Sequence, residues 1–434
     1  MQSKLKIATL SIQHVLAMYA GAVIIPLIVG GEMGLKGEKL TYLVSIDIFM
    51  CGIATILQVW KNRFFGIGLP VVLGCTFTAV GPMLAIGHKY GITAIYGAVI
   101  ISGLMIIVVS KFFGKLVRFF PPVVTGSVVT TIGITLIPVA MNNMAGGEGS
   151  PEFGSVSNVC LAFGTLIFII LLQRFFNGFI RSISILLGLI GGTIAAALMG
   201  KVDFTPVSDS AMFHMIRPLY FGMPTFEWTA IITMFLVAVV SLVESTGVYY
   251  ALSDITEQKI SEKDLAKGYR AEGLASVLGG LFNSFPYTTF SQNVGLVQLS
   301  GVKSKNVIYL MGIFLMIIGV IPKIGALTTI IPPAVLGGAM VAMFGMVIAS
   351  GIKMLSRVDL SSHENLFIIA CSVGMGMGVT VVPKLFTQLP ENFQILTSNG
   401  IVAGSFTAIV LNILFNVIPS KHKKNIKIIE EKAS

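Results

Sequence analysis

The chain has 434 residues, of which 55% are hydrophobic and only 11% are charged, and its mean hydropathy is +0.90. A soluble domain carries about 25% charged residues because its surface must be polar, so this composition excludes soluble enzymes, secreted domains and disordered proteins. The net charge of +10 would suggest nucleic acid as the partner of a soluble protein. In a membrane protein the distribution of charge over the loops matters more than the total, and we expect no nucleic-acid partner.

The apolar residues form runs of about 15–22 residues, which suit helices that cross a bilayer and not the short alternating strands of an outer-membrane barrel. Thirteen runs are long enough to cross, at approximately 9–30, 40–59, 66–86, 93–110, 121–141, 156–172, 182–199, 228–253, 266–282, 306–322, 329–351, 365–382 and 399–419. Residues 286–300 form a more polar segment between two of these runs. No cleavable signal is evident before the first run, so we expect an all-α, multi-pass membrane protein.

Charge counting indicates that the polar segment 286–300 also crosses the membrane. With fourteen spans, 22 of the 29 Lys and Arg residues fall on the side of the two termini and 7 on the other side. With thirteen spans, this asymmetry would largely vanish. The positive-inside rule therefore predicts fourteen spans with both termini cytoplasmic. A polar segment at membrane depth must line a cavity or be buried in protein, which makes 286–300 the first candidate for a functional site.

Two sequence echoes indicate an internal repeat. Residues 121–126 (PPVVTG) resemble 332–337 (PPAVLG), and Pro70 has a counterpart in Pro286 at nearly the same offset. Each offset corresponds to seven spans, an odd number, so the second copy must be inverted, as in many secondary transporters. We expect repeats at 1–220 and 221–434.

The third and tenth spans are the interrupted helices of the predicted repeats. Each has a proline, then a short β-prone stretch at 71–73 or 287–290, and then half a helix. The amino-terminal ends of two half-helices would direct backbone N–H groups and positive dipole ends at one point near the midplane. The polar and aromatic residues expected around that point are Thr76, Phe77, Ser291, Gln292 and Asn293. The alternative is that both prolines only kink packed helices.

Five segments together resemble the nucleobase–ascorbate transporters, also called nucleobase:cation symporter 2. They are 291–305 (SQNVGLVQLSGVKSK), Gln13–His14, 69–77, 244–247 (ESTG) and 270–274 (RAEGL). The resemblance covers nearly the whole chain, and within the family the sequence looks most like the bacterial xanthine permeases. It implies fourteen spans, a core domain at approximately 9–110 plus 228–322, a gate domain at approximately 121–200 plus 329–419, and a homodimer.

The resemblance assigns substrate binding to Glu244 and Gln292. Glu244 lies deep in an apolar run, where an isolated acid is costly and defaults to a functional hypothesis; its carboxylate can accept two ring N–H groups of a purine dione. The Gln292 amide combines an acceptor and a donor, which suits an imide edge, and the family has glutamine here in purine-selective members. A helix-capping role for Gln292 is the alternative. Phe77 would stack on the heterocycle, although core packing would also explain a phenylalanine.

Four further residues receive other roles. Glu272 would serve proton coupling or conformational control, and the family often has aspartate at this position; an ion pair with Arg270 or Lys267 is the alternative. Asn293 would tune affinity, and His14 would make a structural hydrogen bond that holds the pocket. The sequence assigns no role to Asp47. Four cysteines lie in apolar runs without a metal-binding spacing and are expected to be small buried residues: Cys51, Cys75, Cys160 and Cys371.

The sequence thus predicts a proton-coupled importer of an oxopurine, most simply xanthine and next urate, in the plasma membrane of a bacterium. The alternatives are a symporter of uracil or another nucleobase, and an anion exchanger of the same fold. No catalytic or metal-binding cluster and no phosphate-binding loop is recognised, so we expect neither an enzyme nor a primary pump. A channel is disfavoured because the polar groups gather at one depth. The expected partners are the purine base, protons, the lipid bilayer and a second copy of the chain, with no cofactor.

Overall fold

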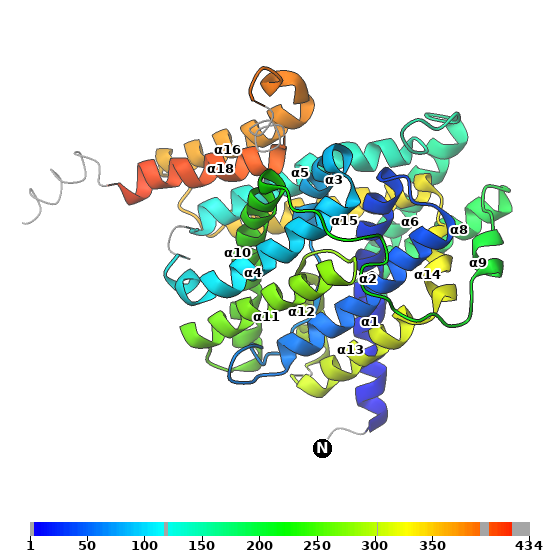
Figure 1. Cartoon of the computed structure of the whole chain (residues 1–434), viewed down its shortest axis with the longest axis horizontal. Coiled ribbons are helices and arrows are strands. Elements are labelled where there is room, and N and C mark those ends of the chain that lie inside the picture. The colour runs from blue at the N-terminus through cyan, green and yellow to red at the C-terminus, as the bar shows by residue number, and fades with distance from the viewer. Residues whose placement is uncertain (1–3, 117–119, 302, 391–398, 419–434) are drawn as a thin grey trace, which may run out of the picture. The chain divides into compact units, whose positions relative to one another are not determined.

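The computed structural model describes residues 4–116, 120–301, 303–390 and 399–418 (Figure 1). Within these ranges, nine helices are long and apolar enough to cross a bilayer. They are α1 (Lys4–Glu32), α2 (Gly37–Val59), α4 (Ile92–Leu116), α5 (Pro122–Met144), α6 (Val156–Phe175), α10 (Trp228–Thr256), α15 (Pro333–Leu355), α16 (His363–Val381) and α18 (Gly400–Asn412), which continues as the π-helical turn η4 (Ile413–Val417). The prediction of a helical, multi-pass membrane protein is confirmed. Arg118 and the C-terminal lysines used in the charge count lie outside the described residues.

The other elements occupy the remaining expected spans and the loops. They are β1 (Leu73–Cys75), η1 (Phe77–Ala79), α3 (Val80–Tyr90), α7 (Gly178–Ser182), α8 (Ser184–Leu198), α9 (Thr205–Asp209), α11 (Glu262–Leu281), β2 (Tyr287–Thr289), α12 (Ser291–Ser300), α13 (Lys305–Gly319), α14 (Pro322–Thr329) and η3 (Pro383–Phe386). The expected span at approximately 306–322 corresponds to α13 and ends where α14 begins. The chain bends by 79° between α13 and α14, because Pro322 lacks an N–H group and is suited to start a new helix.

Both interrupted helices contain a strand, and the two strands pair with each other. β1 and β2 are antiparallel, with Leu73 opposite Thr289 and Cys75 opposite Tyr287. Two more backbone bonds extend the ladder, from Phe290 N to the Val72 carbonyl oxygen (2.9 Å) and from Thr76 N to the Pro286 carbonyl oxygen (3.1 Å). β2 lies where the sequence predicts it, whereas β1 begins two residues later than the expected start at 71. The interruption therefore joins two segments that come from different halves of the chain.

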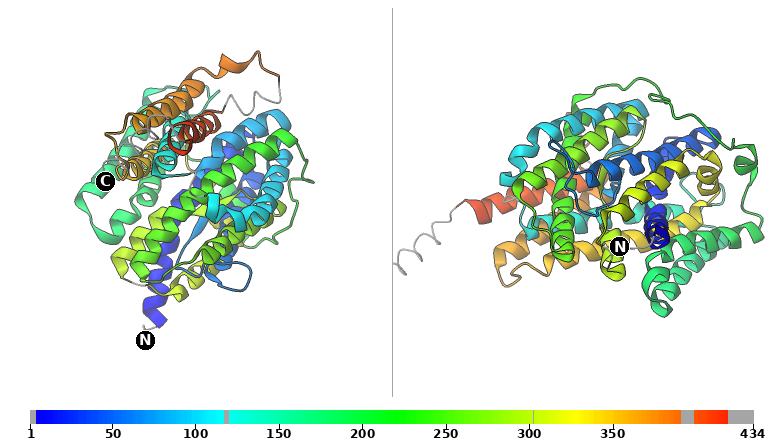
Figure 2. Two further views of the ribbon diagram at one scale, coloured as in Figure 1. Left: turned by 90° about the vertical axis from the view of Figure 1, so that its left-hand side faces the viewer. Right: turned by 90° about the horizontal axis from the view of Figure 1, so that it is seen from below.

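The chain divides into two compact units. The first consists of residues 1–114 and 136–346, and the second of 115–135 and 347–434. In the first unit, α1 and α2 pack against α13, so helices from distant parts of the sequence lie side by side (Figure 2). Gly52 on α2 permits this approach, since a Cβ there would meet the Gly312 carbonyl oxygen of α13 at 2.5 Å. In the second unit, α16 packs against α18.

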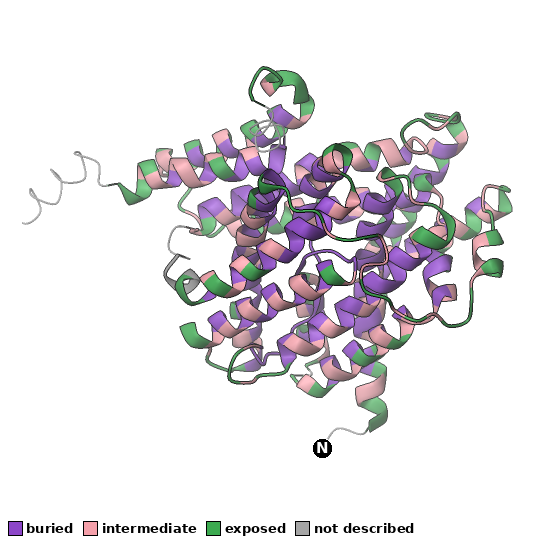
Figure 3. Ribbon diagram, in the orientation of Figure 1, coloured by how far each residue is buried: buried purple, intermediate pink, exposed green. Residues whose placement is uncertain are grey.

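Buried residues gather on the inner faces of the helices, and exposed ones at the helix ends and loops (Figure 3). Some large apolar side chains are exposed along the helices, as expected for surfaces that contact lipid; the examples include Phe163, Ile167 and Ile194. The core also contains many buried hydroxyl groups, whose protons mostly reach backbone carbonyl groups one turn earlier, as for Thr233 (2.7 Å to Thr229). Among the residues that the structure describes, few buried polar side chains lack a hydrogen-bond partner, which makes the exceptions informative.

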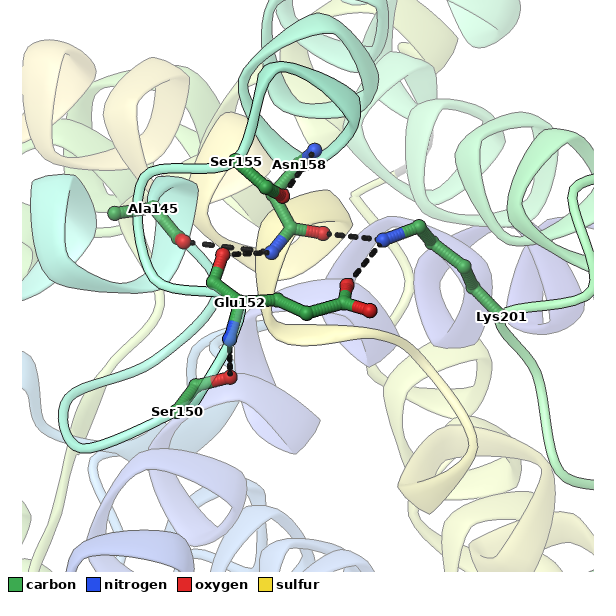
Figure 4. Close-up of polar contacts among 6 residues, drawn as sticks. All are labelled: Ala145, Ser150, Glu152, Ser155, Asn158 and Lys201. Atoms are coloured by element: carbon green, nitrogen blue, oxygen red, sulfur yellow. Dashed lines mark hydrogen bonds and ion pairs between the residues drawn. The ribbon is translucent and has the colours of Figure 1, made fainter.

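A polar network ties the loop after α5 to the start of α6 and to the segment after α8 (Figure 4). Lys201 Nζ lies 2.6 Å from Glu152 Oε2 and donates to Asn158 Oδ1 at 3.0 Å. Asn158 Nδ2 in turn donates to the carbonyl oxygens of Glu152 (3.0 Å) and Ala145 (3.4 Å). Because Asn158 is buried and Glu152 is exposed, the amide is the fixed part of this network, and the ion pair adds little free energy. The network is a structural tie for the loop.

Candidate functional site

The paired strands place the starts of two half-helices beside the middle of α10. η1 and α3 follow β1, α12 follows β2, and η1, α3, β2 and α12 all contact α10. Thr76 precedes η1; its Oγ1 accepts a bond from Thr78 N at 3.3 Å and lies 3.4 Å from Ser241 Oγ on α10. Ser291 and Gln292 are the first residues of α12. The starts of both half-helices therefore lie near α10.

Glu244 lies near the middle of the 29-residue α10, three residues after Ser241. It is half-buried, and no hydrogen bond or ion pair reaches its carboxylate within the described part of the chain. A carboxylate at membrane depth is costly unless donors reach it. A partner supplied from outside the protein would satisfy it, which is the property expected of a ligand-binding acid.

Gln292 and Phe77 make few polar or aromatic side-chain contacts with the rest of the described structure. Gln292 is half-buried and its amide makes no side-chain hydrogen bond among the residues that the structure describes, while Ser291 is exposed. Phe77 is half-buried, and its ring meets the ring of Phe344 edge to face, with centroids 5.8 Å apart. No described contact joins Glu244, Gln292 and Phe77 directly to one another; what they share is the contact of η1 and α12 with α10.

Glu272 on α11 is the opposite of Glu244, because it is buried (2% exposed) and surrounded by donors. Ser245 Oγ donates to Glu272 Oε2 at 3.0 Å, and the Tyr249 hydroxyl donates to Oε1. Tyr249 in turn accepts a bond from the Gln58 amide of α2. The alternative ion pair is not present in the described ranges, where Arg270 Nε instead donates to the Ala266 carbonyl oxygen at 3.1 Å. The longer glutamate thus reaches two donors on α10.

Ser245 connects the Glu272 carboxylate to β2. Its Oγ lies 3.0 Å from Thr288 Oγ1 and accepts bonds from Thr289 N (3.3 Å) and Thr289 Oγ1 (3.2 Å). One hydroxyl group therefore links the buried acid to the strand that leads into α12. The sequence predicts no individual role for Ser245, Tyr249 or Thr288. Ser245 belongs to the segment 244–247, and Thr288 belongs to the β-prone stretch 287–290.

His14 and Asn293 form a buried pair between α1 and α12. Asn293 Nδ2 lies 3.0 Å from His14 Nδ1 and donates to the His14 carbonyl oxygen at 3.3 Å. Both residues are 2% exposed. The pair fixes the residue that follows Gln292, so it orients the first turn of α12.

Asp47 on α2 is fully buried, with three donors on one oxygen. Its Oδ1 accepts from Cys75 Sγ (2.7 Å), from Ser284 Oγ and from the Tyr287 hydroxyl (3.4 Å). One carboxylate oxygen of Asp47 and the sulfur atoms of Cys51 and Cys75 lie within 4.8 Å of one another. Because the Cys75 thiol keeps its proton and donates it to Oδ1, it is not in the thiolate form that binds a metal, and we assign no metal to the cluster.

The cysteines differ from the sequence expectation. Cys51 and Cys75 are buried as expected, but Cys75 is a hydrogen-bond donor and not merely a small apolar residue. Cys160 is exposed and Cys371 is partly exposed. Both lie in apolar helices, α6 and α16. A small side chain such as cysteine can face lipid there without making the helix surface polar.

Comparisons with solved structures support the fold. The transmembrane domain of the cyanobacterial bicarbonate transporter BicA is similar with a TM-score of 0.62 at 17% identity, covering 86% of this chain and 96% of that domain. Murine solute carrier 26 family member A9, an anion transporter in the inward-facing state, is similar with a TM-score of 0.60 at 12% identity, covering 93% of this chain and 68% of that one. At this identity the likeness concerns the fold alone.

Sequence comparisons define the family. The model of the Permease family matches residues 5–385. A xanthine permease of Bacillus subtilis (strain 168) is 68% identical over 419 residues, which cover 96% of this chain and 95% of that protein. The uric acid permease PucK of the same organism is 65% identical over 411 residues, covering 95% and 96%. The chain is therefore a transporter and not an enzyme, and it belongs to the Permease family of nucleobase–ascorbate transporters.

Proposed function

We propose that the chain imports an oxopurine, xanthine or urate, together with a proton across the plasma membrane. The observation that supports this most directly is Glu244, a carboxylate at the middle of α10 that has no partner within the described residues. Relatives at 68% and 65% identity are named for xanthine and uric acid. An oxopurine supplies the N–H groups that this acid lacks. We assign Glu244, Gln292, Phe77, Thr76 and Ser291 to its site.

Four of the five site residues have separate tasks in this proposal. The Glu244 carboxylate accepts hydrogen bonds from ring N–H groups, and the Gln292 amide pairs with a ring carbonyl and a neighbouring N–H group. Phe77 covers one face of the flat ring system. The first backbone N–H groups of η1 and α12 direct positive dipole ends toward the ring carbonyl oxygens. Thr76 holds the start of η1 against Ser241.

Proton coupling is assigned to Glu272 through Ser245. An ionised Glu272 accepts a hydrogen bond from the Ser245 hydroxyl, which is the arrangement in the structure. When Glu272 takes up a proton on Oε2, two donors would face each other there, so the Ser245 hydroxyl must turn its proton toward another acceptor. Thr288 Oγ1, at 3.0 Å, is in reach. The protonation of Glu272 thereby changes the hydrogen bonds of Thr288 in β2, which leads into α12.

The proposed architecture has fourteen spans in two inverted repeats of seven, both termini in the cytoplasm, a homodimeric assembly and alternating access by movement of a core against a gate. The pairing of β1 with β2 supports the repeat, because in each of the two spans a proline is followed by a strand that interrupts the helix. An inverted repeat places its substrate site where two such interrupted spans meet.

Uptake of radiolabelled xanthine into proteoliposomes, competed by unlabelled bases and repeated with and without an inward proton gradient, tests the proposal. We expect accumulation that requires the gradient and competition by urate and xanthine above uracil. Competition mainly by uracil would support the alternative nucleobase symporter. Uptake of sulfate or bicarbonate with no effect of purines would support the anion exchanger and contradict the proposal.

A further inference from the structure

A second buried carboxylate holds the other end of the strand pair. Cys75 and Tyr287, which lie opposite each other in the β1–β2 ladder, both donate to Oδ1 of Asp47. Ser284, in the turn before β2, donates to the same oxygen. Glu272 reaches Thr288 and Thr289 of β2 through Ser245, and Asp47 reaches the Cys75–Tyr287 pair directly. The site's two strands are thus connected to two acids.

The second oxygen of Asp47 has no partner. Oδ2 is buried and accepts no hydrogen bond from the described residues, and the whole residue is 0% exposed. A buried carboxylate oxygen without a donor carries a large desolvation cost when it is charged. A proton on Oδ2 removes that charge and leaves all three bonds to Oδ1 in place. Oδ2 is therefore a site at which a proton can be held without rearranging the donors around Oδ1.

The groups that face Asp47 are thiols, hydroxyls and a backbone N–H group from several elements. They are Cys51 of α2, Cys75 of β1, Tyr287 of β2, Ser284 and the N–H of Phe285 in the preceding turn, and Tyr96 of α4. None of these groups is a cation, so the charge of an ionised Asp47 is balanced only by neutral dipoles. Ser284 Oγ and the Tyr287 hydroxyl lie 2.5 Å apart, and either can be the donor. Donors that can exchange roles allow both protonation states of the acid.

We propose that Asp47 is a second proton-carrying carboxylate of this transporter, which binds and releases a proton on Oδ2 as the β1–β2 ladder moves during transport. The inference rests on the proposed proton-coupled function. The sequence separation of Asp47 and Glu272 is 225 residues, nine more than the 216 residues between Pro70 and Pro286. The two acids would thus occupy corresponding spans of the two proposed halves, the second and the ninth.

Asp47→Asn tests the proposal, because asparagine keeps an acceptor at Oδ1 and places a neutral donor at Oδ2, as in the protonated acid. Three assays on purified protein in proteoliposomes are compared: xanthine binding, xanthine exchange without a gradient, and accumulation driven by an inward proton gradient. We expect binding and exchange close to wild type, while gradient-driven accumulation falls by about tenfold. Thr233→Val is the matched control, since it removes a buried hydroxyl that bonds only within α10 and keeps the acid and its donors, and it should still accumulate xanthine.

Two results with Asp47→Asn overturn the proposal. Equal losses of binding, exchange and accumulation would show that Asp47 only holds the strands. Wild-type behaviour in all three assays would show that Asp47 stays protonated throughout the cycle. If the wild type accumulates xanthine independently of the proton gradient, the proposed proton coupling is wrong, whatever the variants do. If wild type and Asp47→Asn both accumulate xanthine equally in response to the proton gradient, the proposed role of Asp47 is wrong but the proposed proton coupling stands.

A second measurement applies if Asp47→Asn does not fold. Ser284→Ala and Tyr287→Phe each remove a donor from Oδ1, which disfavours the ionised form of Asp47. The pH profile of xanthine uptake should therefore move toward higher pH, by about half a unit or more. Thr233→Val, which removes a hydroxyl that bonds only within α10, should leave the profile in place. An unmoved profile in both variants of the Asp47 neighbours would overturn the proposal.

Discussion

Glu244 on α10 and Glu272 on α11 are both acids at membrane depth, but their surroundings are opposite. Glu272 is 2% exposed and accepts bonds from Ser245 and Tyr249. Glu244 is half-buried and has no described partner. An acid with its donors built into the protein contributes to the fold and can transmit its charge state. An acid without them is available to a ligand. In the proposed function, Glu272 therefore contributes to the structure and Glu244 binds the substrate.

Glu244→Gln should have the largest effect on binding. The substitution removes the charge that strengthens two hydrogen bonds to substrate N–H groups, at a cost of about 2–3 kcal/mol, or about 30- to 150-fold in Kd. Because no described protein group bonds to this carboxylate, the melting temperature should change little. Isothermal titration with xanthine and thermal unfolding of the purified protein measure both quantities. Wild-type affinity in this variant would remove Glu244 from the binding site.

Glu272→Gln should show the reverse pattern. One of the two donors, Ser245 or Tyr249, would face the new NH₂ group, so the protein should lose about 1–3 kcal/mol of stability. Xanthine affinity should change less than in Glu244→Gln, while gradient-driven accumulation is lost. Tyr249→Phe is a useful companion, because it removes one donor and keeps the acid; it should lower stability and retain coupling. A large loss of affinity with unchanged stability in Glu272→Gln would break the comparison.

Gln292→Glu should change selectivity by a smaller amount. An ionised glutamate has no donor for a ring carbonyl, which leaves a buried acceptor unpaired at about 1–2 kcal/mol. Protonation of the new acid restores a donor, so the defect should be smaller at acidic pH. Inhibition constants for xanthine and uracil at two pH values measure this. If Gln292 only caps a helix, all substrates should be affected alike, with less folded protein.

Asp264→Asn should have the smallest effect, because it alters the start of α11 and leaves the buried acids in place. Partial burial raises the pKa of Asp264, but hydrogen bonds from Lys61 and Ser261 outweigh it and lower the pKa to about 2. The lowered pKa stabilises the fold above the unfolded value of 3.8, and this contribution disappears as the pH falls toward 2. The substitution should cost about 0.5 kcal/mol at neutral pH, with xanthine binding unchanged; unfolding in denaturant at pH 7 tests it.

Much of the fold could be predicted from the sequence, since long apolar runs, the prolines at 70 and 286 and the β-prone 287–289 mark helices and their interruptions directly. The bend between α13 and α14 lies at Pro322, and a proline in an apolar run marks such a break without giving its angle. The candidate residues Glu244 and Gln292 stand out as polar groups in apolar surroundings. The donors around Glu272 do not, because Ser245 and Tyr249 become its partners only when α10 and α11 pack together.

The strand pair also has a consequence for how the protein is made. β1 belongs to the first half of the chain and β2 to the second, so a ribosome completes β1 long before β2 exists. In the bilayer an unpaired strand leaves its N–H and carbonyl groups without partners. The first half of the chain therefore cannot complete the surroundings of Thr76 and Phe77 on its own. Strand β1 must be kept from lipid until the chain has been synthesised and inserted as far as residue 290. A protein truncated before residue 290 should therefore be recognised as unassembled and degraded.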